Sequence, residues 1–250
     1  MIYALMSTKI NLIIKTLPTG MVATASWLLK QGMSKELQKQ YRDGGWLEAI
    51  GDGAMIISGS AVDYVGAIAA LQQQQGRNVH IGGKTALAYQ GLTHYLNLSA
   101  HIVTLFGKRG EKLPAWFENH DWGHEFKYFT SSFLPHNMGI KQWDTGNFDV
   151  NISTPARAMM ECLYLVPLAQ DMDECMELMV GLNDLRPKEV QELLEDCTSV
   201  KVKRLFLYMA ETCKHQWFQY LDLSKIDLGA GKRSIVKGGK FIKKYNITVS

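Results

Sequence analysis

Residues 21–60, MVATASWLLKQGMSKELQKQYRDGGWLEAIGDGAMIISGS, decide the fold of the N-terminal part of this chain. Thr24 is placed to cap a short helix, which Gly32 ends. Ser34 is placed to cap the next helix, which ends at Gly44. Two short helices separated by a tight glycine turn are therefore predicted at the start of the chain.

Two apolar runs, residues 46–50 and 54–57, flank the turn Gly51-Asp52-Gly53. Apolar runs across a glycine-rich turn are typical of a β-hairpin. An earlier run, residues 7–17, has isoleucine and leucine at helical spacing. Three helices followed by a hairpin are the order of a winged helix-turn-helix, a small head that reads DNA.

The helix that starts after Ser34 carries two different faces. Leu37 and Tyr41 lie four residues apart and form an apolar stripe. The polar side chains Lys35, Gln38 and Arg42 follow at i, i+3 and i+7, and Lys39 lies beside them. We predict that these four residues, Lys35, Gln38, Lys39 and Arg42, bind DNA, because such side chains contact phosphates and base edges. A head of this kind used for protein contacts remains the alternative.

The remainder of the chain predicts an α+β protein. Residues 61–74 form one apolar helix, and the run Gln72-Gln73-Gln74-Gln75-Gly76 closes it. We place the domain boundary there, with a winged helix-turn-helix domain at residues 1–75 and a larger mixed α/β domain at residues 76–250. Short strands and helices alternate until Pro155, after which the pattern turns helical. The last residues, 228–249, are punctuated by glycine and predict a hairpin.

The net charge of +3 is unevenly distributed along the chain. Residues 1–60 carry a net +2, residues 61–196 a net −7 and residues 197–250 a net +8. Basic segments attract phosphate backbones. A solvated tail that pairs with the acidic middle is the alternative. No apolar run is long enough to cross a bilayer, and the lysine-interrupted N-terminus does not resemble a signal peptide, so we expect a cytoplasmic protein.

The sequence contains no enzyme signature. The stretch Gly82-Gly83-Lys84-Thr85 lacks the upstream glycine of a phosphate-binding loop, because neither Asn78 nor Val79 is a glycine. His120 and His124 are four apart but have no obvious third metal ligand. The four widely spaced cysteines predict buried thiols rather than disulfides or zinc sites. We therefore expect no catalytic residues, no metal and no cofactor.

Several stretches are similar to a known family. They are GWLEAIGDGAMIISG, VHIGGKTALAYQGLTHYL, LPAWF, STPARAMMECLYLVP, GLNDLRPKEVQELLEDCTSVKVKRLFLYMAE and LGAGKRSIVKGGKFIKKYNITV. Together they resemble the AbiEi-type antitoxins of type IV toxin–antitoxin systems, over nearly the whole chain.

The resemblance implies two functions. The head would repress its own operon by binding inverted repeats in the promoter. The C-terminal domain would counter a partner nucleotidyltransferase toxin without necessarily forming a stable complex. On charge, we expect a basic functional surface in that domain, composed of Lys201, Lys203, Arg204, Lys232 and Arg233.

Two rival functions remain open at the level of sequence. One is an enzyme that acts on nucleic acid, with the head as a targeting module and a cryptic C-terminal active site. Such an enzyme would bring carboxylates or histidines together in one pocket of the folded domain. The other is a protein-binding adaptor, which a strong salt dependence of DNA affinity would argue against.

Overall fold

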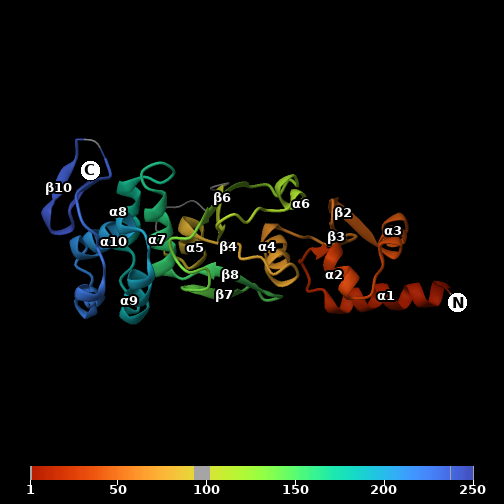
Figure 1. Cartoon of the computed structure of the whole chain (residues 1–250). Coiled ribbons are helices and arrows are strands. Elements are labelled where there is room, and N and C mark those ends of the chain that lie inside the picture. The colour runs from red at the N-terminus through yellow and green to blue at the C-terminus, as the bar shows by residue number, and fades with distance from the viewer. Residues whose placement is uncertain (1, 93–101, 237, 250) are drawn as a thin grey trace. The chain divides into compact units, whose positions relative to one another are not determined.

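The computed structural model describes residues 2–92, 102–236 and 238–249, with side chains from Lys9 onward (Figure 1). Residues 93–96 of the stretch VHIGGKTALAYQGLTHYL, and Lys237, lie outside the described residues. The chain forms two compact units, of which unit 1 contains residues 1–80, 110–124 and 142–151, and unit 2 contains residues 81–109, 125–141 and 152–250. The units interleave along the chain, whereas the glutamine run predicts one break after residue 75. A domain boundary after residue 75 therefore stays a prediction.

Unit 1 begins with the helices and hairpin in the order that the sequence predicts. They are α1 (Ile2–Thr16), α2 (Ala25–Lys30), α3 (Lys35–Asp43), β2 (Leu47–Gly51) and β3 (Ala54–Ile57) (Figure 1). The winged helix-turn-helix arrangement and the α+β class are thereby confirmed. The core of this head is apolar and fully enclosed, with Ile13, Leu28, Met33 and Leu47 each at most 1% exposed.

Local side-chain chemistry sets the limits of α2 and α3. The Thr24 hydroxyl accepts a hydrogen bond from the backbone N–H of Trp27, and the Ser34 hydroxyl accepts one from Leu37. Each bond satisfies a donor that the first helical turn leaves without an intrahelical partner. Gly44 caps the end of α3, and Gly45 follows with a φ of 73°. Both predicted caps and the predicted glycine stop are confirmed.

The sheet of the head contains a third strand that the sequence does not signal. Strand β1 (Ala23–Thr24) pairs antiparallel with β3, which also pairs antiparallel with β2, giving the order β1-β3-β2. Two residues are too few to show an alternating pattern, so periodicity does not reveal β1. Both residues of β1 are fully buried.

Helix α4 (Tyr64–Gln73) begins later than the predicted Ala61 because the Asp63 carboxylate accepts hydrogen bonds from the N–H groups of Val65 and Gly66. The helix packs very closely in unit 1. A Cβ built on Gly66 would lie 1.8 Å from the carbonyl oxygen of Gly20, so only glycine fits there. The short helix α6 (Ala115–Glu118) also belongs to unit 1.

A five-stranded sheet has the strand order β6-β5-β4-β8-β7. Its strands are β4 (His80–Ile81), β5 (Ile102–Lys108), β6 (Glu125–Ser131), β7 (Ile140–Asp144) and β8 (Asp149–Ser153). In unit 2, β5 runs parallel to β6 over its whole length, and Ile81 of β4 pairs in parallel with Ile152 of β8. Strands β7 and β8 are adjacent in the sheet.

Helices supply most of the remaining core of unit 2. They are α5 (Gly83–Tyr89), α7 (Pro155–Leu165), α8 (Met172–Val180), α9 (Pro187–Asp196) and α10 (Val200–Thr212), with 3-10 turns η1 (Gln216–Tyr220), η2 (Leu223–Lys225) and η3 (Lys243–Tyr245). Helix α7 lies at the centre, since α5, α8, α9 and α10 all contact it and its residues 156–163 are buried. Pro155 occupies the first turn of α7, as predicted.

The C-terminal segment forms a small sheet rather than a simple hairpin. Strands β10 (Lys240–Ile242) and β11 (Ile247–Val249) pair antiparallel, and β9 (Arg233–Ser234) pairs parallel to β11. The expected hairpin is thus present, with one more strand beside it. Among the described residues, none of the helices is both long enough and apolar enough to cross a bilayer.

Candidate nucleic-acid interface

Helix α3 is anchored in the head by the residues on its inner side. Tyr41 is 2% exposed, and Met33, just before the helix, is fully buried. Burial raises the pKa of the Tyr41 hydroxyl above its usual value, which keeps this ring neutral. The helix is therefore fixed along one side, and the opposite side faces solvent.

Gln38 lies on the inner side of α3, which corrects our prediction for this residue. Its side chain is 2% exposed, and its Nε2 donates hydrogen bonds to the carbonyl oxygens of Ala25 at 3.2 Å and Met33 at 3.0 Å. Helix α3 packs on both α2 and β2, so the arc that it buries is wider than the stripe of Leu37 and Tyr41 indicates. Gln38 holds the helix-turn-helix together and is not available to read bases.

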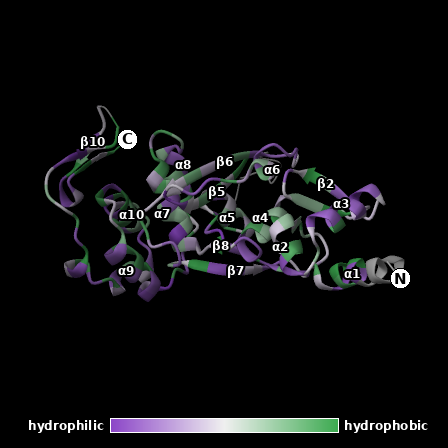
Figure 2. Ribbon diagram, turned by 45° about the vertical axis from the view of Figure 1, so that its right-hand side comes forward, coloured by the Kyte–Doolittle hydropathy of each residue, from purple (hydrophilic) through white to green (hydrophobic). Residues whose placement is uncertain are grey.

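Lys35, Lys39 and Arg42 are all exposed on α3, as predicted. At about 100° per residue, these three positions fall within about 60° of one another around the helix. The acidic side chains of α3, Glu36 and Asp43, lie on the adjoining part of the exposed side. Figure 2 shows α3 as a hydrophilic element of the head. The three cations form a continuous basic strip along one edge of the solvent-facing side.

Gln40 and Trp46 are exposed residues near this strip that the sequence analysis does not single out. Gln40 lies on the solvent-facing side of α3, and Trp46, between α3 and β2, is 52% exposed. The Trp46 ring approaches Gly44, since a Cβ built there would lie 3.5 Å from its Cδ1. Leu37 and Tyr41 mark the buried side of α3 in the sequence. Helical geometry puts Gln40 on a different side, so the sequence alone was enough to predict that Gln40 is exposed.

The wing, which is the hairpin of β2 and β3, is supported from one side. A Cβ built on Gly51 would lie 2.9 Å from the Cα of Trp116, so β2 touches the backbone of α6. Trp116 itself is 3% exposed. Asp52 and Gly53 at the tip are exposed. The exposed Asp52 carboxylate would repel a phosphate group. Any contact of the wing with DNA would therefore depend on its shape more than on its charge.

Arg204 is not part of a basic surface, which corrects a second prediction. Its side chain is 1% exposed, and its guanidinium donates to four carbonyl oxygens, those of Leu228, Gly229, Gly231 and Asn246, at 2.8–3.0 Å. Burial, and then the charge of Arg233, lower the pKa of Arg204 below its usual value. Four of the five N–H donors of a guanidinium are thus used to hold the C-terminal segment on α10.

Lys201 and Lys203 are also withdrawn from the expected surface. The Lys201 Nζ donates to the carbonyl oxygens of Tyr164 at 2.7 Å and Val166 at 2.5 Å, at the end of α7. A cation is favourable there because unpaired carbonyls gather at a helix C-terminus. Burial lowers the pKa of Lys201. Lys203 is 4% exposed.

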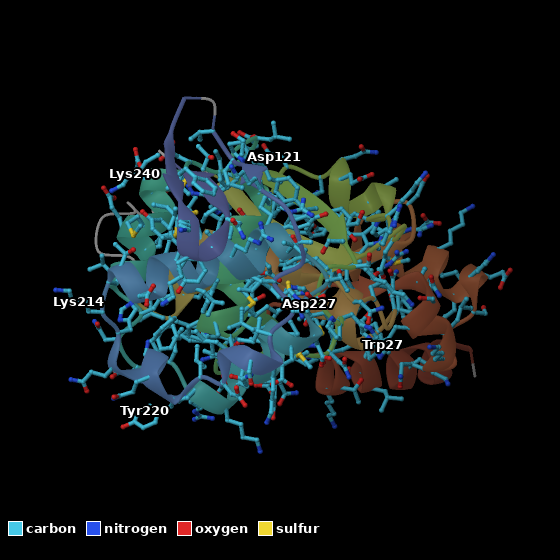
Figure 3. All side chains as sticks on the ribbon, turned by 60° about the vertical axis from the view of Figure 1, so that its left-hand side comes forward. Trp27, Asp121, Lys214, Tyr220, Asp227 and Lys240 are labelled. Atoms are coloured by element: carbon cyan, nitrogen blue, oxygen red, sulfur yellow. The ribbon has the colours of Figure 1, made fainter. Side chains whose placement is uncertain are left out.

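Lys232 and Arg233 are exposed, as predicted. The Lys232 ammonium lies 5.0 Å from the centre of the Phe241 ring, which is 40% exposed. Residues 228–250 contain no acidic side chain. Lys240, on the same small sheet, is also exposed (Figure 3). The basic character of the C-terminal segment therefore resides on its small sheet and not on α10.

The turn between β4 and α5 holds an internal carboxylate where a phosphate loop would hold its ligand. Glu161 Oε2 accepts hydrogen bonds from the Gly83 N–H at 2.9 Å and from the Ser153 hydroxyl at 2.8 Å. A Cβ on Gly82 would lie 2.4 Å from the same oxygen. Lys84 pairs with Glu174 at 2.7 Å. The motif is a tight turn between β4 and α5, which agrees with its lack of phosphate-loop spacing.

The remaining candidates for chemistry are engaged in packing. Within the described residues there is no group of three or more His, Cys, Asp or Glu side chains that could hold a metal ion. His120 packs edge-on against Trp122, and His124 packs edge-on against Tyr64. All four cysteines are free thiols. Burial raises the pKa of the Cys175 thiol to about 12, the reverse of what an activated nucleophile needs.

Comparisons with known proteins agree with this arrangement. Residues 6–98 match the family described as "Transcriptional regulator, AbiEi antitoxin N-terminal domain". Residues 100–250 match the family described as "Transcriptional regulator, AbiEi antitoxin, Type IV TA system". No functionally curated protein matches the chain.

Among solved structures, the RV2827C protein from Mycobacterium tuberculosis is similar, with a TM-score of 0.58 and 12% sequence identity. The similarity covers 97% of this chain and 90% of that chain, and at this identity it shows the fold alone. The two family matches together span nearly all of the sequence. The protein therefore belongs to the AbiEi antitoxins, the transcriptional regulators of type IV toxin–antitoxin systems.

Proposed function

We propose that this protein represses its own operon by binding inverted repeats in the promoter. The observation that carries the proposal is the exposed strip of Lys35, Lys39 and Arg42 on a helix that is capped by Ser34. Phosphate contacts from lysine and arginine position a DNA-binding head and make its affinity dependent on salt. The proposed role requires the compartment that holds the promoter, so the protein acts in the cytoplasm.

Base reading falls to the polar side chains that remain exposed. Gln38 is buried, so Arg42 and Gln40 are the residues of α3 that reach base edges in this proposal. Arginine pairs with guanine and glutamine with adenine in the major groove. Trp46, exposed beside the end of α3, adds an apolar contact to the sugar–phosphate backbone.

The test is a gel shift and footprint on the upstream promoter, at low and at moderate salt. A Lys35→Glu/Lys39→Glu/Arg42→Glu variant should lose about 100-fold or more in affinity. The matched control is Lys188→Glu/Lys214→Glu/Lys225→Glu, which makes the same charge change at exposed lysines of unit 2. Equal loss in both variants would show a general charge effect and would refute the assignment of α3.

We further propose that the C-terminal domain counters a partner nucleotidyltransferase toxin, without a stable complex. Membership of the antitoxin family supports this activity. Of the five basic residues that the sequence predicts for this surface, Lys232 and Arg233 are the two that are exposed. In this proposal they contact a phosphate-bearing or acidic partner. A Lys232→Glu/Arg233→Glu variant, co-expressed with the toxin, should fail to restore growth while it still protects the promoter. Full restoration of growth by this variant would contradict the role of these two residues.

A further inference from the structure

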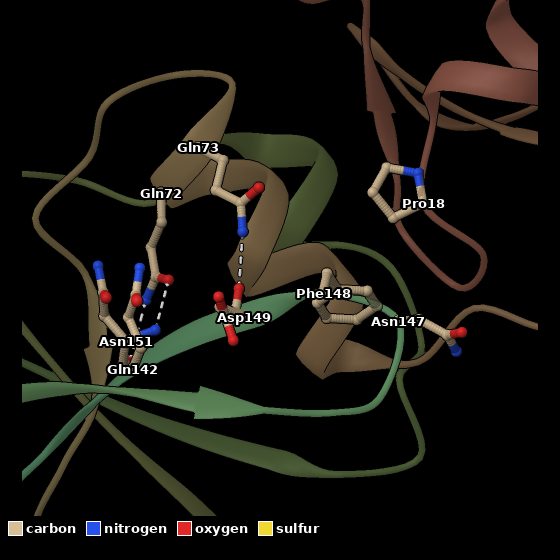
Figure 4. Close-up of a pocket in the computed structure, with 8 residues that line it drawn as sticks. All are labelled: Pro18, Gln72, Gln73, Gln142, Asn147, Phe148, Asp149 and Asn151. Atoms are coloured by element: carbon tan, nitrogen blue, oxygen red, sulfur yellow. Dashed lines mark hydrogen bonds between the residues drawn. The ribbon is translucent and has the colours of Figure 1, made fainter.

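Unit 1 contains a pocket with a volume of about 390 Å³, separate from the basic strip of α3 (Figure 4). Its walls are provided by α4, by β7 and β8 with the turn between them, and by the segment after α1. The lining residues are Pro18, Gln72, Gln73, Gln142, Asn147, Phe148, Asp149 and Asn151. Volumes of this size are typical of sites for small molecules.

Two of the lining amides form a fixed wall. Gln72 donates to the carbonyl oxygens of Val79 at 2.8 Å and Asn151 at 3.1 Å, and it accepts from the Asn151 N–H at 2.8 Å. Gln73 donates to the Asp149 carbonyl at 2.6 Å. These bonds tie α4 to β8 along one wall of the pocket.

Among the remaining lining amides, those of Gln142 and Asn151 are available. The side chains of Gln142 and Asn151 lie side by side in Figure 4. Neither side-chain amide makes a hydrogen bond to another described residue. Each presents one carbonyl acceptor and two N–H donors, so together they offer adjacent donors and acceptors to a ligand.

The charge of the pocket excludes anions. None of its eight lining residues is Lys, Arg or His, and the one ionisable side chain is the exposed Asp149 carboxylate. A phosphate bound here would lack a cation and would be repelled by Asp149. The pocket therefore suits a neutral ligand with several hydrogen-bonding groups.

Phe148 gives the pocket an aromatic side. Its ring is half-buried and packs near the turn that follows α1, since a Cβ on Gly20 would lie 3.7 Å from its Cε1. Pro18 lies on the same side of the pocket as Phe148 (Figure 4). The ring lies at one end of the pocket, and Gln142 and Asn151 lie at the other (Figure 4). An aromatic ring and free amides are the groups that bind unpaired nucleobases, which stack on rings and bond through their edges.

We propose that this pocket binds an unphosphorylated nucleoside through its base. Adenine fits best, because Asn and Gln amides pair in a bidentate manner with its N6 and N7. Gln142 and Asn151 bond the base edge, and Phe148 stacks on its face. Sugars also bind to amides and aromatic rings, and the competition experiment with glucose separates the two classes of ligand.

The test is ligand-observed NMR on the full chain with adenosine, its 5′-monophosphate and glucose. We expect adenosine to bind with a Kd of about 1 mM or tighter, a modest affinity that suits an open site of few contacts. The monophosphate should bind at least about 5-fold more weakly, and glucose should not compete. A Gln142→Ala/Asn151→Ala variant should lose about 10-fold in affinity for adenosine.

The control variant is Asn183→Ala, which removes an exposed amide from unit 2 and should leave binding unchanged. Thermal melts of both variants show that they are folded. The proposal is overturned if adenosine does not bind, if glucose displaces it, or if the pocket variant binds as well as wild type. The experiment contains no promoter DNA, so it is decided independently of the proposed repressor function.

Discussion

The side chain of Gln74 is hydrogen-bonded to the backbone of Thr24, the residue that caps α2. Its Oε1 accepts from the Thr24 N–H at 2.8 Å, and its Nε2 donates to the Val22 carbonyl at 2.7 Å. All of these groups are buried. The Gln74 amide thus satisfies the backbone N–H and carbonyl groups along one edge of β1, as a neighbouring strand would. The end of α4 is thereby joined to the beginning of the helix-turn-helix.

Replacing Gln74 should destabilise unit 1 strongly. A Gln74→Leu variant leaves one buried N–H and one buried carbonyl without partners, which costs about 2–4 kcal/mol in total. The measurement is the urea midpoint of unfolding. Gln75→Ala removes a half-buried side chain that accepts one hydrogen bond from the Arg77 Nε, and it should cost less than about 1 kcal/mol. Equal midpoints for the two variants would contradict the importance of this bond.

Gln38 and Gln40 should behave in opposite ways, although they are two residues apart on α3. Gln38→Leu removes the donor from the carbonyls of Ala25 and Met33, so stability should fall by about 1–3 kcal/mol. Gln40→Ala changes an exposed side chain, so stability should stay within about 0.5 kcal/mol. On the proposed operator, Gln40→Ala should weaken affinity by about 10-fold. Thermal melts and gel shifts measure the two effects, and the reverse pattern would return Gln38 to the base-reading side.

The buried ion pair Arg157–Glu161 should be essential for folding of unit 2. The Arg157 Nε lies 2.8 Å from Glu161 Oε1, and the side chains are 4% and 0% exposed. Glu161→Ala leaves a buried cation without its partner, which costs about 3–5 kcal/mol. Denaturant unfolding measures this loss. The exposed pair Lys188–Glu192 has the same spacing in sequence, and its disruption should cost about 0.5 kcal/mol or less.

A double variant tests whether the cost comes from the unpaired charge. Arg157→Met/Glu161→Leu removes both charges and should be more stable than Glu161→Ala. The carbonyls of Pro135 and Met138, and the Gly83 N–H, still lose their partners in this variant. It should therefore stay below wild type. A double variant less stable than Glu161→Ala would show that backbone bonding, and not charge pairing, is the dominant role.

The C-terminal sheet should open at both acid and alkaline pH. The hydrogen bond from Lys244, and then that from the Tyr245 hydroxyl at 2.9 Å, lower the pKa of Glu211 below its usual value. Burial, and then the bond to Glu211, raise the pKa of Tyr245 above its usual value. These contacts hold η3, and with it β11, against α10.

The two shifts act at opposite ends of the pH scale. The lowered pKa of Glu211 gives stability that is complete above about pH 4.3 and is lost as the pH falls through the folded-state pKa. The raised pKa of Tyr245 gives stability that is complete below about pH 10 and is lost as the pH rises toward the folded-state pKa. The NMR methyl signals of Ile247 and Val249 should report a plateau between these limits. Tyr245→Phe should reduce the amplitude of the alkaline transition, and an unchanged transition in that variant would disprove the assignment.

Local chemistry explains why the order of the head is predictable from sequence. Thr24 and Ser34 cap helices by bonding N–H groups three residues away, and Gly51-Asp52-Gly53 turns the chain within a hairpin. Such bonds form between residues close in sequence, so the residue types alone indicate them. The exposed positions of Lys35, Lys39 and Arg42 were predicted for the same reason. The family was likewise indicated by ordered stretches of sequence.

The tertiary structure decided which polar side chains water reaches. Gln38 bonds a carbonyl 13 residues away, Arg204 one 42 residues away and Gln74 an N–H 50 residues away. Nothing in the neighbouring sequence shows that such a side chain will be buried, because its partners are brought to it only when distant segments pack. Lysine and arginine counted along the chain therefore overstated the basic surface of α10. The sequence determined the helices, turns and family of this protein, whereas packing determined which of its polar groups became internal ties and which stayed free to bind a partner.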